Sequence, residues 1–124
     1  SLLVGGGLYT GMDFLKALAL GADAVFIGTI ALIALVHTQA VKVLPWDPPT
    51  KLIFEGGRQK DKLNIDQGAQ SLANFLKASV QEMQVAALCL GKDHLSAVDK
   101  GDLSTANREL AAYLGIRWCG DPSV

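Results

Sequence analysis

The first 43 residues alternate between short apolar runs and longer segments with helical periodicity. Leu2–Val4 and Ala24–Ile27 are apolar, and each is followed by glycine, which is typical of buried parallel strands. Residues 10–20 and 29–43 instead carry apolar side chains at spacings of three and four, which predicts helices. The predicted order is β-α-β-α, and its connection has about the minimum length of a right-handed parallel crossover. Because two parallel strands do not form a stable sheet alone, the pattern predicts that further strands complete it.

Polar and glycine residues mark the ends of the first predicted helix. Thr10 is placed as its N-cap, and Asp13 brings negative charge to the first turn, where the helix dipole favours it. Gly21 follows Leu20 as a C-cap glycine does. Asp13 and Lys16 are three positions apart, and we interpret them as a capping and surface pair.

Prolines interrupt the chain after the second predicted helix. Three of them lie between Pro45 and Pro49, which excludes helix and favours an extended path. We expect Trp46, which lies among these prolines, to dock as a packing anchor. Residues 51–63 predict either a weak exposed hairpin or a loop.

A long amphipathic helix is predicted to begin after Asn64 or Asp66 and to end at Gly91. Its apolar positions recur every three or four residues, which predicts one packing face. That face comprises Ile65, Ala69, Leu72, Leu76, Ser79, Met83, Ala86 or Ala87, and Leu90.

Shorter elements are predicted after the long helix. We expect a short helix near residues 94–98 and a last helix that runs from Ser104 or Thr105 to Leu114. Gly115 would end that last helix, and the remaining tail is predicted to be irregular.

The predicted elements divide the chain into three parts. Residues 1–43 form two βα units, residues 44–63 form a proline-rich linker or loop, and residues 64–124 form a mostly helical extension. The predicted fold class is therefore α/β.

Composition and charge restrict the class of protein further. The chain has 124 residues, of which 50% are hydrophobic, so it is long enough to bury a core. Its formal net charge is −1, which gives no electrostatic case for binding nucleic acid or an anionic membrane. Cys89 and Cys119 lie far apart without CxxC spacing, which favours two reduced thiols.

The hydropathy pattern contains no predicted membrane span. The longest uncharged apolar run, Ala24–Val36, is shorter than the roughly 20 residues that a spanning helix needs. We therefore expect a cytoplasmic location, while an anchor upstream of Ser1 would not be visible in this sequence. The chain begins without Met inside an apolar run, which predicts a fragment whose partner is a missing upstream part or a second copy.

Glycines follow both predicted strands, at Gly5-Gly6-Gly7 and at Gly28-Thr29. Glycine lets backbone N–H groups approach a ligand, and the N-terminus of the following helix adds unpaired donors and the positive end of the helix dipole. In (β/α)₈ barrels, the loops after strands 7 and 8 commonly form a phosphate site. A phosphate site and simple tight turns both remain open here, and no GxGxxG fingerprint is present.

Several motifs carry a family resemblance. Residues 5–29, GGGLYTGMDFLKALALGADAVFIGT, resemble the strand 7 to strand 8 region of FMN-dependent and related phosphate-binding barrels. The next run, GTIALIALVHTQAVKVLPWDPPTKLIF, is similar to the ferredoxin-type, stand-alone glutamate-synthase-like family of FMN-binding proteins. The runs GAQSLANFLKASVQEM, ALCLGKDHL and KGDL resemble the C-terminal segment of that family, so the resemblance covers roughly residues 2–115.

This resemblance implies a fold, a cofactor and an activity. The chain would be the C-terminal fragment of a TIM barrel, made of the last two βα units and the helical extension. The backbone amides of Gly6, Gly7, Gly28 and Thr29 would bind the phosphate of FMN. The parent enzyme would form L-glutamate from 2-oxoglutarate and an ammonia donor, with its catalytic residues on earlier strands. The fragment alone is expected to be inactive.

One feature departs from glutamate synthases proper, which insert a cysteine-bearing segment that ligates an iron–sulfur cluster. Here Ala34–Gln39 runs through this region without a cysteine, and neither Cys89 nor Cys119 has cluster spacing. We therefore expect no iron–sulfur cluster and no metal site. This absence also weakens the case for true glutamate synthase activity.

Two other functions remain open from the sequence. The chain could be a structural or assembly module that self-associates through exposed strands. It could also belong to a barrel of the 2-hydroxyacid oxidase or IMP dehydrogenase type, against which the His-Thr-Gln and Pro-Trp-Asp-Pro-Pro runs argue. We interpret His37 as a polar or surface residue, and Gln39 as a candidate for hydrogen bonding across the barrel rim.

Overall fold

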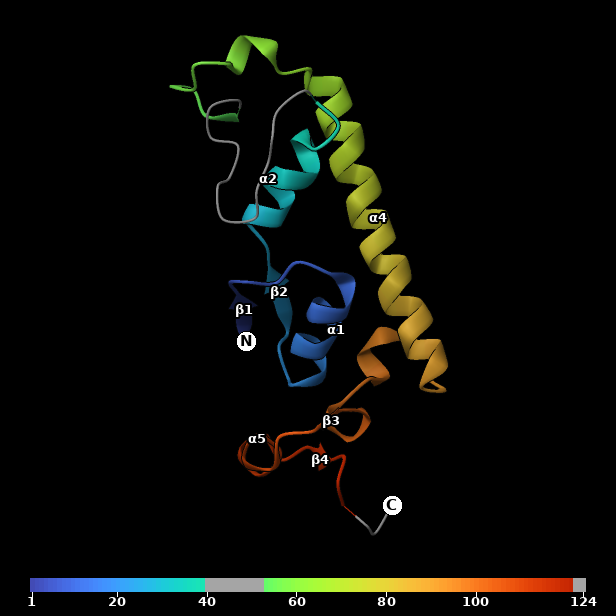
Figure 1. Cartoon of the computed structure of the whole chain (residues 1–124). Coiled ribbons are helices and arrows are strands. Elements are labelled where there is room, and N and C mark those ends of the chain that lie inside the picture. Colours follow the sequence, from blue (N-terminus) through green and yellow to red (C-terminus); the bar gives the residue numbers. More distant parts are fainter. Residues whose placement is uncertain (40–52, 122–124) are drawn as a thin grey trace.

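The computed structural model describes residues 1–39 and 53–121, and within them the chain is mixed α/β (Figure 1). Strand β1 (Leu3–Gly5), helix α1 (Gly11–Ala19), strand β2 (Ala24–Phe26) and helix α2 (Thr29–Val36) follow one another in the predicted order. The two strands pair in parallel, with Leu3 opposite Ala24 and Gly5 opposite Phe26. The predicted βαβα unit is therefore confirmed.

Helix α1 begins and ends where its caps were predicted. The Thr10 side chain accepts a hydrogen bond from the Asp13 N–H, and the Asp13 carboxylate accepts one from the Thr10 N–H, which forms a capping box. Gly21 follows the helix with a φ of +107°, a conformation that favours glycine. Both predicted caps are confirmed.

Helix α2 is shorter than the sequence predicted. It ends at Val36 with His37 as the C-cap, whereas the periodicity predicted a helix to about Val43. The side chains of Thr38 and Gln39 bond to groups of a later helix, and these tertiary hydrogen bonds compete with a further helical turn. The proline-rich segment and Trp46 lie outside the described residues.

The long helix α4 (Ile65–Cys89) has the predicted N-cap, and its buried face agrees with the predicted one only in part. The Asn64 side chain accepts from the Gln67 N–H, and Gly91 follows the helix with a φ of +73°. Ile65, which was assigned to the packing face, is 73% exposed, and Ala69, Leu76 and Leu90 are exposed as well. Ser79, Met83 and Ala87 of the predicted face are buried, and so are Gly68 and Ser71, which the prediction did not include.

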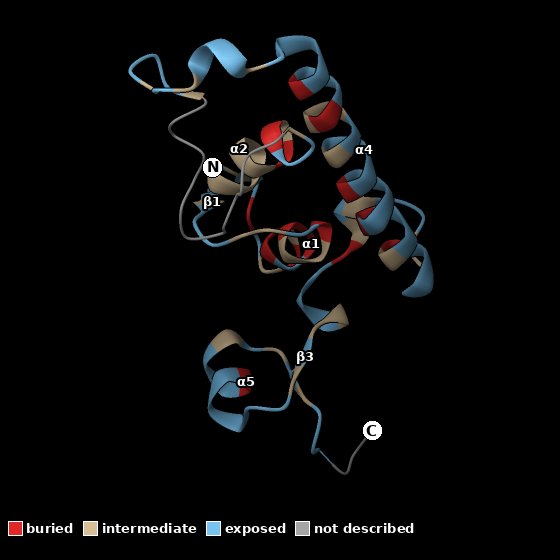
Figure 2. Cartoon of the chain, turned by 45° about the horizontal axis from the view of Figure 1, so that its top comes forward, coloured by how far each residue is buried: buried red, intermediate tan, exposed pale blue. Residues whose placement is uncertain are grey.

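Small residues form the buried face because α4 lies close against two other helices (Figures 1 and 2). A Cβ on Gly68 would lie 2.9 Å from the Leu35 side chain of α2. A Cβ on Gly11 of α1 would collide with the carbonyl oxygen of Ser79. Leucine or isoleucine at these contact points would hold the helices apart, so the larger apolar residues of α4 lie to the side.

The hydrophobic core lies between α1, α4 and the segment that follows α4. The short 3₁₀ turns η2 (Leu95–Ala97) and η3 (Lys100–Asp102) lie within that segment, and the first of them confirms the short helix predicted near residues 94–98. The buried members of the core cluster are Phe14, Leu15, Ala19, Met83, Ala87 and Val98.

The C-terminal segment differs from the prediction in its first and last residues. Ser104 and Thr105 form strand β3, and helix α5 begins only at Arg108, after the N-cap Asn107. Strand β4 (Arg117–Trp118), predicted as irregular, pairs in parallel with β3. Backbone hydrogen bonds between β3 and β4 stabilise these two-residue strands, which are too short to have a clear signal in the local sequence. Helix α5 ends at Leu114, before Gly115, as predicted.

The sequence predicted either a hairpin or a loop for residues 51–63. Residues 53–63 contain no strand, which favours the loop for this part of the segment. A single 3₁₀ turn, η1, spans Lys60–Lys62. Residues 51 and 52, the start of that predicted segment, lie outside the described residues.

Candidate functional site

The two glycine turns lie at the same edge of the β1–β2 sheet. Parallel pairing places the carboxyl ends of both strands together, and Gly5 of β1 is opposite Phe26 of β2. Gly6 and Gly7 come directly after β1, with φ angles of +99° and +68°. Gly28 and Thr29 come two and three residues after β2. The fold therefore brings together the four residues that the sequence predicted as a phosphate site.

No atom of the described residues fills the space outside these turns. A Cβ built on Gly6, Gly7 or Gly28 would meet no described protein atom within 4 Å. At Gly5, by contrast, a Cβ would lie 3.2 Å from the side chain of Phe26. Gly6 and Gly7 are glycines because of their positive φ, and their lack of a side chain leaves the backbone accessible to a ligand.

Within residues 1–39 and 53–121, no side chain caps the N-terminus of α2. Gly28 is its N-cap residue, no side chain caps the first turn, and that turn contains no acidic residue. The Leu32 N–H is the donor that bonds back to the Gly28 carbonyl. As far as the described residues go, the N–H groups at the start of α2, which include that of Thr29, remain donors for a ligand, and the helix dipole favours an anion there.

The N-terminus of α1 is instead occupied by carboxylates of the protein. Glu82 of α4 accepts a hydrogen bond from the Gly11 N–H at 2.9 Å. Asp13 accepts from the N–H groups of Tyr9 and Thr10 at 3.2 and 3.1 Å. Because these carboxylates occupy the N-terminus of α1, α2 has the N-terminus that is better suited to an anion.

Hydrogen bonds from the Tyr9 N–H and from Thr10 hold the pKa of Asp13 below its ordinary value of 3.8. A carboxyl group whose pKa is lower in the folded protein stabilises the fold above the unfolded pKa, and this stabilisation is lost as the pH falls through the folded pKa.

We expect Asp13→Ala to lower the free energy of unfolding by about 0.5–1 kcal/mol at neutral pH, since a third of the side chain is exposed. The difference in unfolding free energy between this variant and the parent protein should become smaller below pH 3.8. Urea unfolding of both proteins at neutral pH and below pH 3.8 measures this difference. Asp66→Ala in the first turn of α4 is the control, and an equal, pH-independent loss in both variants would contradict the capping role.

The His-Thr-Gln run joins α2 to α4 in the structure. Gln39 donates to the Asn64 carbonyl at 3.0 Å and accepts from the Asn64 N–H at 2.9 Å. The Thr38 hydroxyl lies 3.1 Å from that of Ser71. His37 is exposed and bonds through Nδ1 to the Ala34 carbonyl. Thr38 and Gln39 therefore connect the end of α2 to α4 and its N-cap, whereas His37 bonds within α2; the hydrogen bonding predicted for Gln39 is directed to the backbone of residue 64.

The described residues offer no metal site. Residues 1–39 and 53–121 contain no group of three or more His, Cys, Asp or Glu side chains that could hold an ion. Cys89 and Cys119 are free and exposed. Among the described helices, none is both long enough and apolar enough to cross a bilayer.

Comparison with known proteins identifies the family. The family model for the conserved region in glutamate synthase matches residues 1–93. The chain belongs to the glutamate synthase family. An archaeal-type glutamate synthase [NADPH] of Dehalococcoides mccartyi is 60% identical over 98% of the chain. The archaeal glutamate synthase [NADPH] of Archaeoglobus fulgidus is 39% identical over 94% of it. A glutamate synthase large subunit-like protein of Rhizobium meliloti is 33% identical over 96% of it. No solved structure matches the chain.

The chain spans only part of these relatives. It covers 25% of the Dehalococcoides protein, 22% of the Archaeoglobus protein and 30% of the Rhizobium protein. The glutamate synthase family match includes both glycine turns and all of α4, and it ends before β3.

Sequence reasoning missed Glu82. Its carboxylate accepts a hydrogen bond from the Gly11 N–H of α1, although the two residues are 71 positions apart in the chain. Its signal was weak: Glu82 lies beside the predicted packing face, on a helix in which charged residues are few.

Proposed function

We propose that the chain is the C-terminal part of an FMN-dependent oxidoreductase of the glutamate synthase family, and that it supplies the phosphate end of the flavin site. β1-α1 and β2-α2 would be the last two βα units of a TIM barrel, with the remaining strands in polypeptide outside this chain. The family match and the relatives' greater length support this proposal. The parallel register that aligns the two turns is the structural observation that carries it.

The residues present fit a phosphate group. Two turns at one sheet edge offer backbone N–H groups, their glycines leave the approach open, and the uncapped α2 supplies the positive end of its dipole. Gly6, Gly7, Gly28 and Thr29 would hold the phosphate through backbone amides, and the Thr29 hydroxyl adds one further donor. Glu82 and Asp13 occupy the other helix N-terminus, which would direct the anion towards α2.

The proposed reaction follows the family. FMN carries hydride chemistry when bound, while the protein orients it and excludes water. The parent would form L-glutamate from 2-oxoglutarate and an ammonia donor, and this chain by itself would not be catalytic. An iron–sulfur cluster is not part of the proposal, because Ala34–Gln39 contains no cysteine. The relatives described above are all named for glutamate synthase, which favours this reaction over a 2-hydroxyacid oxidase or IMP dehydrogenase type.

The test is purification of the full-length polypeptide that carries this segment. We expect the protein to be yellow with bound flavin, and to bind FMN more tightly than riboflavin, which lacks the phosphate. A preparation that has no flavin absorbance and takes up neither compound would overturn the FMN assignment. Equal affinity for FMN and riboflavin would leave the flavin but remove the phosphate role of the turns.

A further inference from the structure

Helix α4 contacts both of the helices that follow the glycine turns (Figure 1). At its N-terminus, the backbone of the N-cap Asn64 bonds to the Gln39 side chain just beyond α2. Further along α4, the Glu82 carboxylate bonds to the start of α1. One continuous helix of 25 residues therefore joins the two βα units on which the candidate site is built.

The turn after β1 is held at its two ends. Gly5 pairs with Phe26 at one end, and Gly11 begins α1 at the other. Gly6 and Gly7 lie between these ends, and a Cβ built on either would meet no described atom within 4 Å. Since side-chain packing does not fix these two glycines, their position depends on how the ends of the turn are held.

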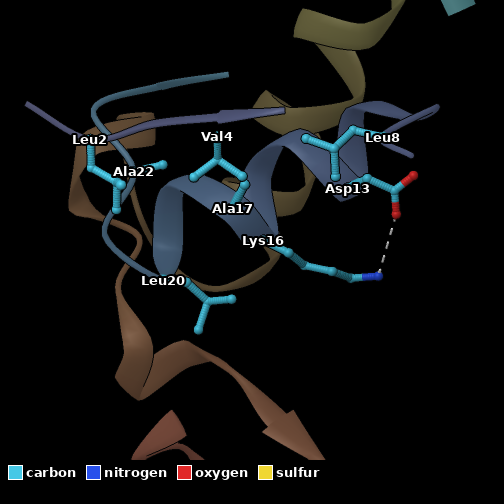
Figure 3. A pocket seen from close by; sticks show the side chains of 8 residues that line it. All are labelled: Leu2, Val4, Leu8, Asp13, Lys16, Ala17, Leu20 and Ala22. Carbon is cyan, nitrogen blue, oxygen red and sulfur yellow. Dashed lines mark ion pairs between the residues drawn. The ribbon is translucent and has the colours of Figure 1, made fainter. Parts of the chain in front are cut away.

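Two carboxylates hold the end of the turn next to α1, and they come from different elements. Asp13 accepts hydrogen bonds from two N–H groups of the turn, but it belongs to α1 itself and faces Lys16 beside the groove between β1 and α1 (Figure 3). Glu82 accepts from the Gly11 N–H at 2.9 Å and belongs to α4. Asp13 therefore moves with α1, whereas Glu82 fixes the start of α1 relative to the helix that also holds α2.

The Glu82 bond is separate from the apolar contacts between the two helices. In the part of the chain that the structure describes, it is the one side-chain hydrogen bond between α4 and α1. The shared core of buried residues, which includes Leu15 and Met83, does not include Glu82. Loss of the carboxylate would therefore release the end of the turn while the apolar core stays in place.

We propose that Glu82 is a positioning residue for the flavin phosphate: through the Gly11 N–H, it holds the turn after β1 at a fixed distance from the N-terminus of α2. Donors that bind one phosphate group from two turns must keep their geometry to within about 0.5 Å. A hydrogen bond to an ionised carboxylate is among the stronger ones, which suits it to this role. The inference rests on the proposed function, because it concerns how the phosphate end of that site is held.

Three substitutions of Glu82 in the full-length polypeptide separate its hydrogen bond from its charge. Glu82→Gln keeps an acceptor oxygen at the same reach, Glu82→Asp keeps the charge on a side chain that is one methylene shorter, and Glu82→Ala removes both. We expect the ratio of FMN affinity to riboflavin affinity to stay within about threefold of the parent value in Glu82→Gln. In Glu82→Asp and Glu82→Ala the ratio should fall about tenfold, because the Gly11 N–H loses its acceptor. Fluorescence titration with each flavin measures the ratio.

Val98→Ala is the matched control for stability. It removes methyl groups from the core that α1 and α4 share, so it should lower the free energy of unfolding and leave the affinity ratio unchanged. Urea unfolding of every variant shows which of them are destabilised. Should Glu82→Ala fail to fold, the comparison of Glu82→Gln with Glu82→Asp decides the question.

The positioning role is wrong if Glu82→Asp and Glu82→Ala lower stability but keep the parent ratio, because the bond then only joins two helices. It is also wrong if the ratio falls as far in Glu82→Gln as in Glu82→Asp, since the acceptor oxygen is then not what matters. In both cases a parent protein that prefers FMN to riboflavin leaves the proposed function intact. A parent protein that binds both flavins equally would instead remove the phosphate role of the turns, and the role of Glu82 with it.

Discussion

Replacing Gly11 with alanine should lower the free energy of unfolding by about 2–4 kcal/mol. The added methyl group would collide with the Ser79 carbonyl oxygen and lie 2.7 Å from the Glu82 carboxylate. The Ser79 carbonyl belongs to the backbone of α4 and cannot rotate away, so α1 and α4 would have to separate. The Glu82 hydrogen bond to the Gly11 N–H would be strained by the same movement.

The sign of this effect makes the prediction specific. Alanine is a better helix former than glycine by about 1 kcal/mol, so propensity alone predicts that the substitution stabilises α1. Gly56→Ala is the matched control, because a Cβ there meets no described atom within 4 Å and should change stability by less than about 0.5 kcal/mol. Urea unfolding of the two variants beside the parent protein gives both values. A stabilised Gly11→Ala protein would show that α1 and α4 are not in close contact.

Replacing Thr29 with aspartate should weaken FMN binding by roughly 100-fold, which corresponds to about 2.7 kcal/mol. The new carboxylate would stand at the N-terminus of α2, where no acidic residue and no side-chain cap is present. It would repel the phosphate and compete for the N–H donors that we propose hold it. Riboflavin affinity should stay within about threefold of the parent value, because riboflavin carries no phosphate.

The control for Thr29→Asp is Asn107→Asp, which places the same carboxylate at the N-cap of α5. It should leave the affinity for both flavins unchanged. Fluorescence titration of the full-length polypeptide with FMN and with riboflavin measures the four values. If Thr29→Asp weakens both flavins equally, the site is disturbed as a whole and the phosphate does not lie at α2.

The glycine turns show what can and cannot be predicted from local sequence. The parallel pairing that places both glycine turns at one edge of the sheet follows the prediction, because an apolar run that ends in glycine has a local signature and parallel strands end at one edge. The contrast between the two helix N-termini could not be predicted. Glu82 reaches Gly11 only through the packing of α4 on α1, and nothing near Gly11 in the sequence indicates that contact.

The buried face of α4 shows the same limit. Hydropathy assigned Ile65, Leu76 and Leu90 to the interior, and all three are exposed. Periodicity gives the spacing of a packing face but not the distance of the neighbouring helix, and here a close neighbour selects glycine and serine.

The sequence by itself determined the order of β1, α1, β2 and α2, the presence of α4 and α5, and most of the ends of these elements. Thr10, Asn64, Gly21 and Gly115 act through hydrogen bonds and backbone conformations within a few residues, so their roles are local. Only the tertiary structure decided which faces are buried, where α2 stops and how β3 finds β4. Those outcomes depend on contacts between residues far apart in the chain, whose energies have no signature in any short stretch of sequence.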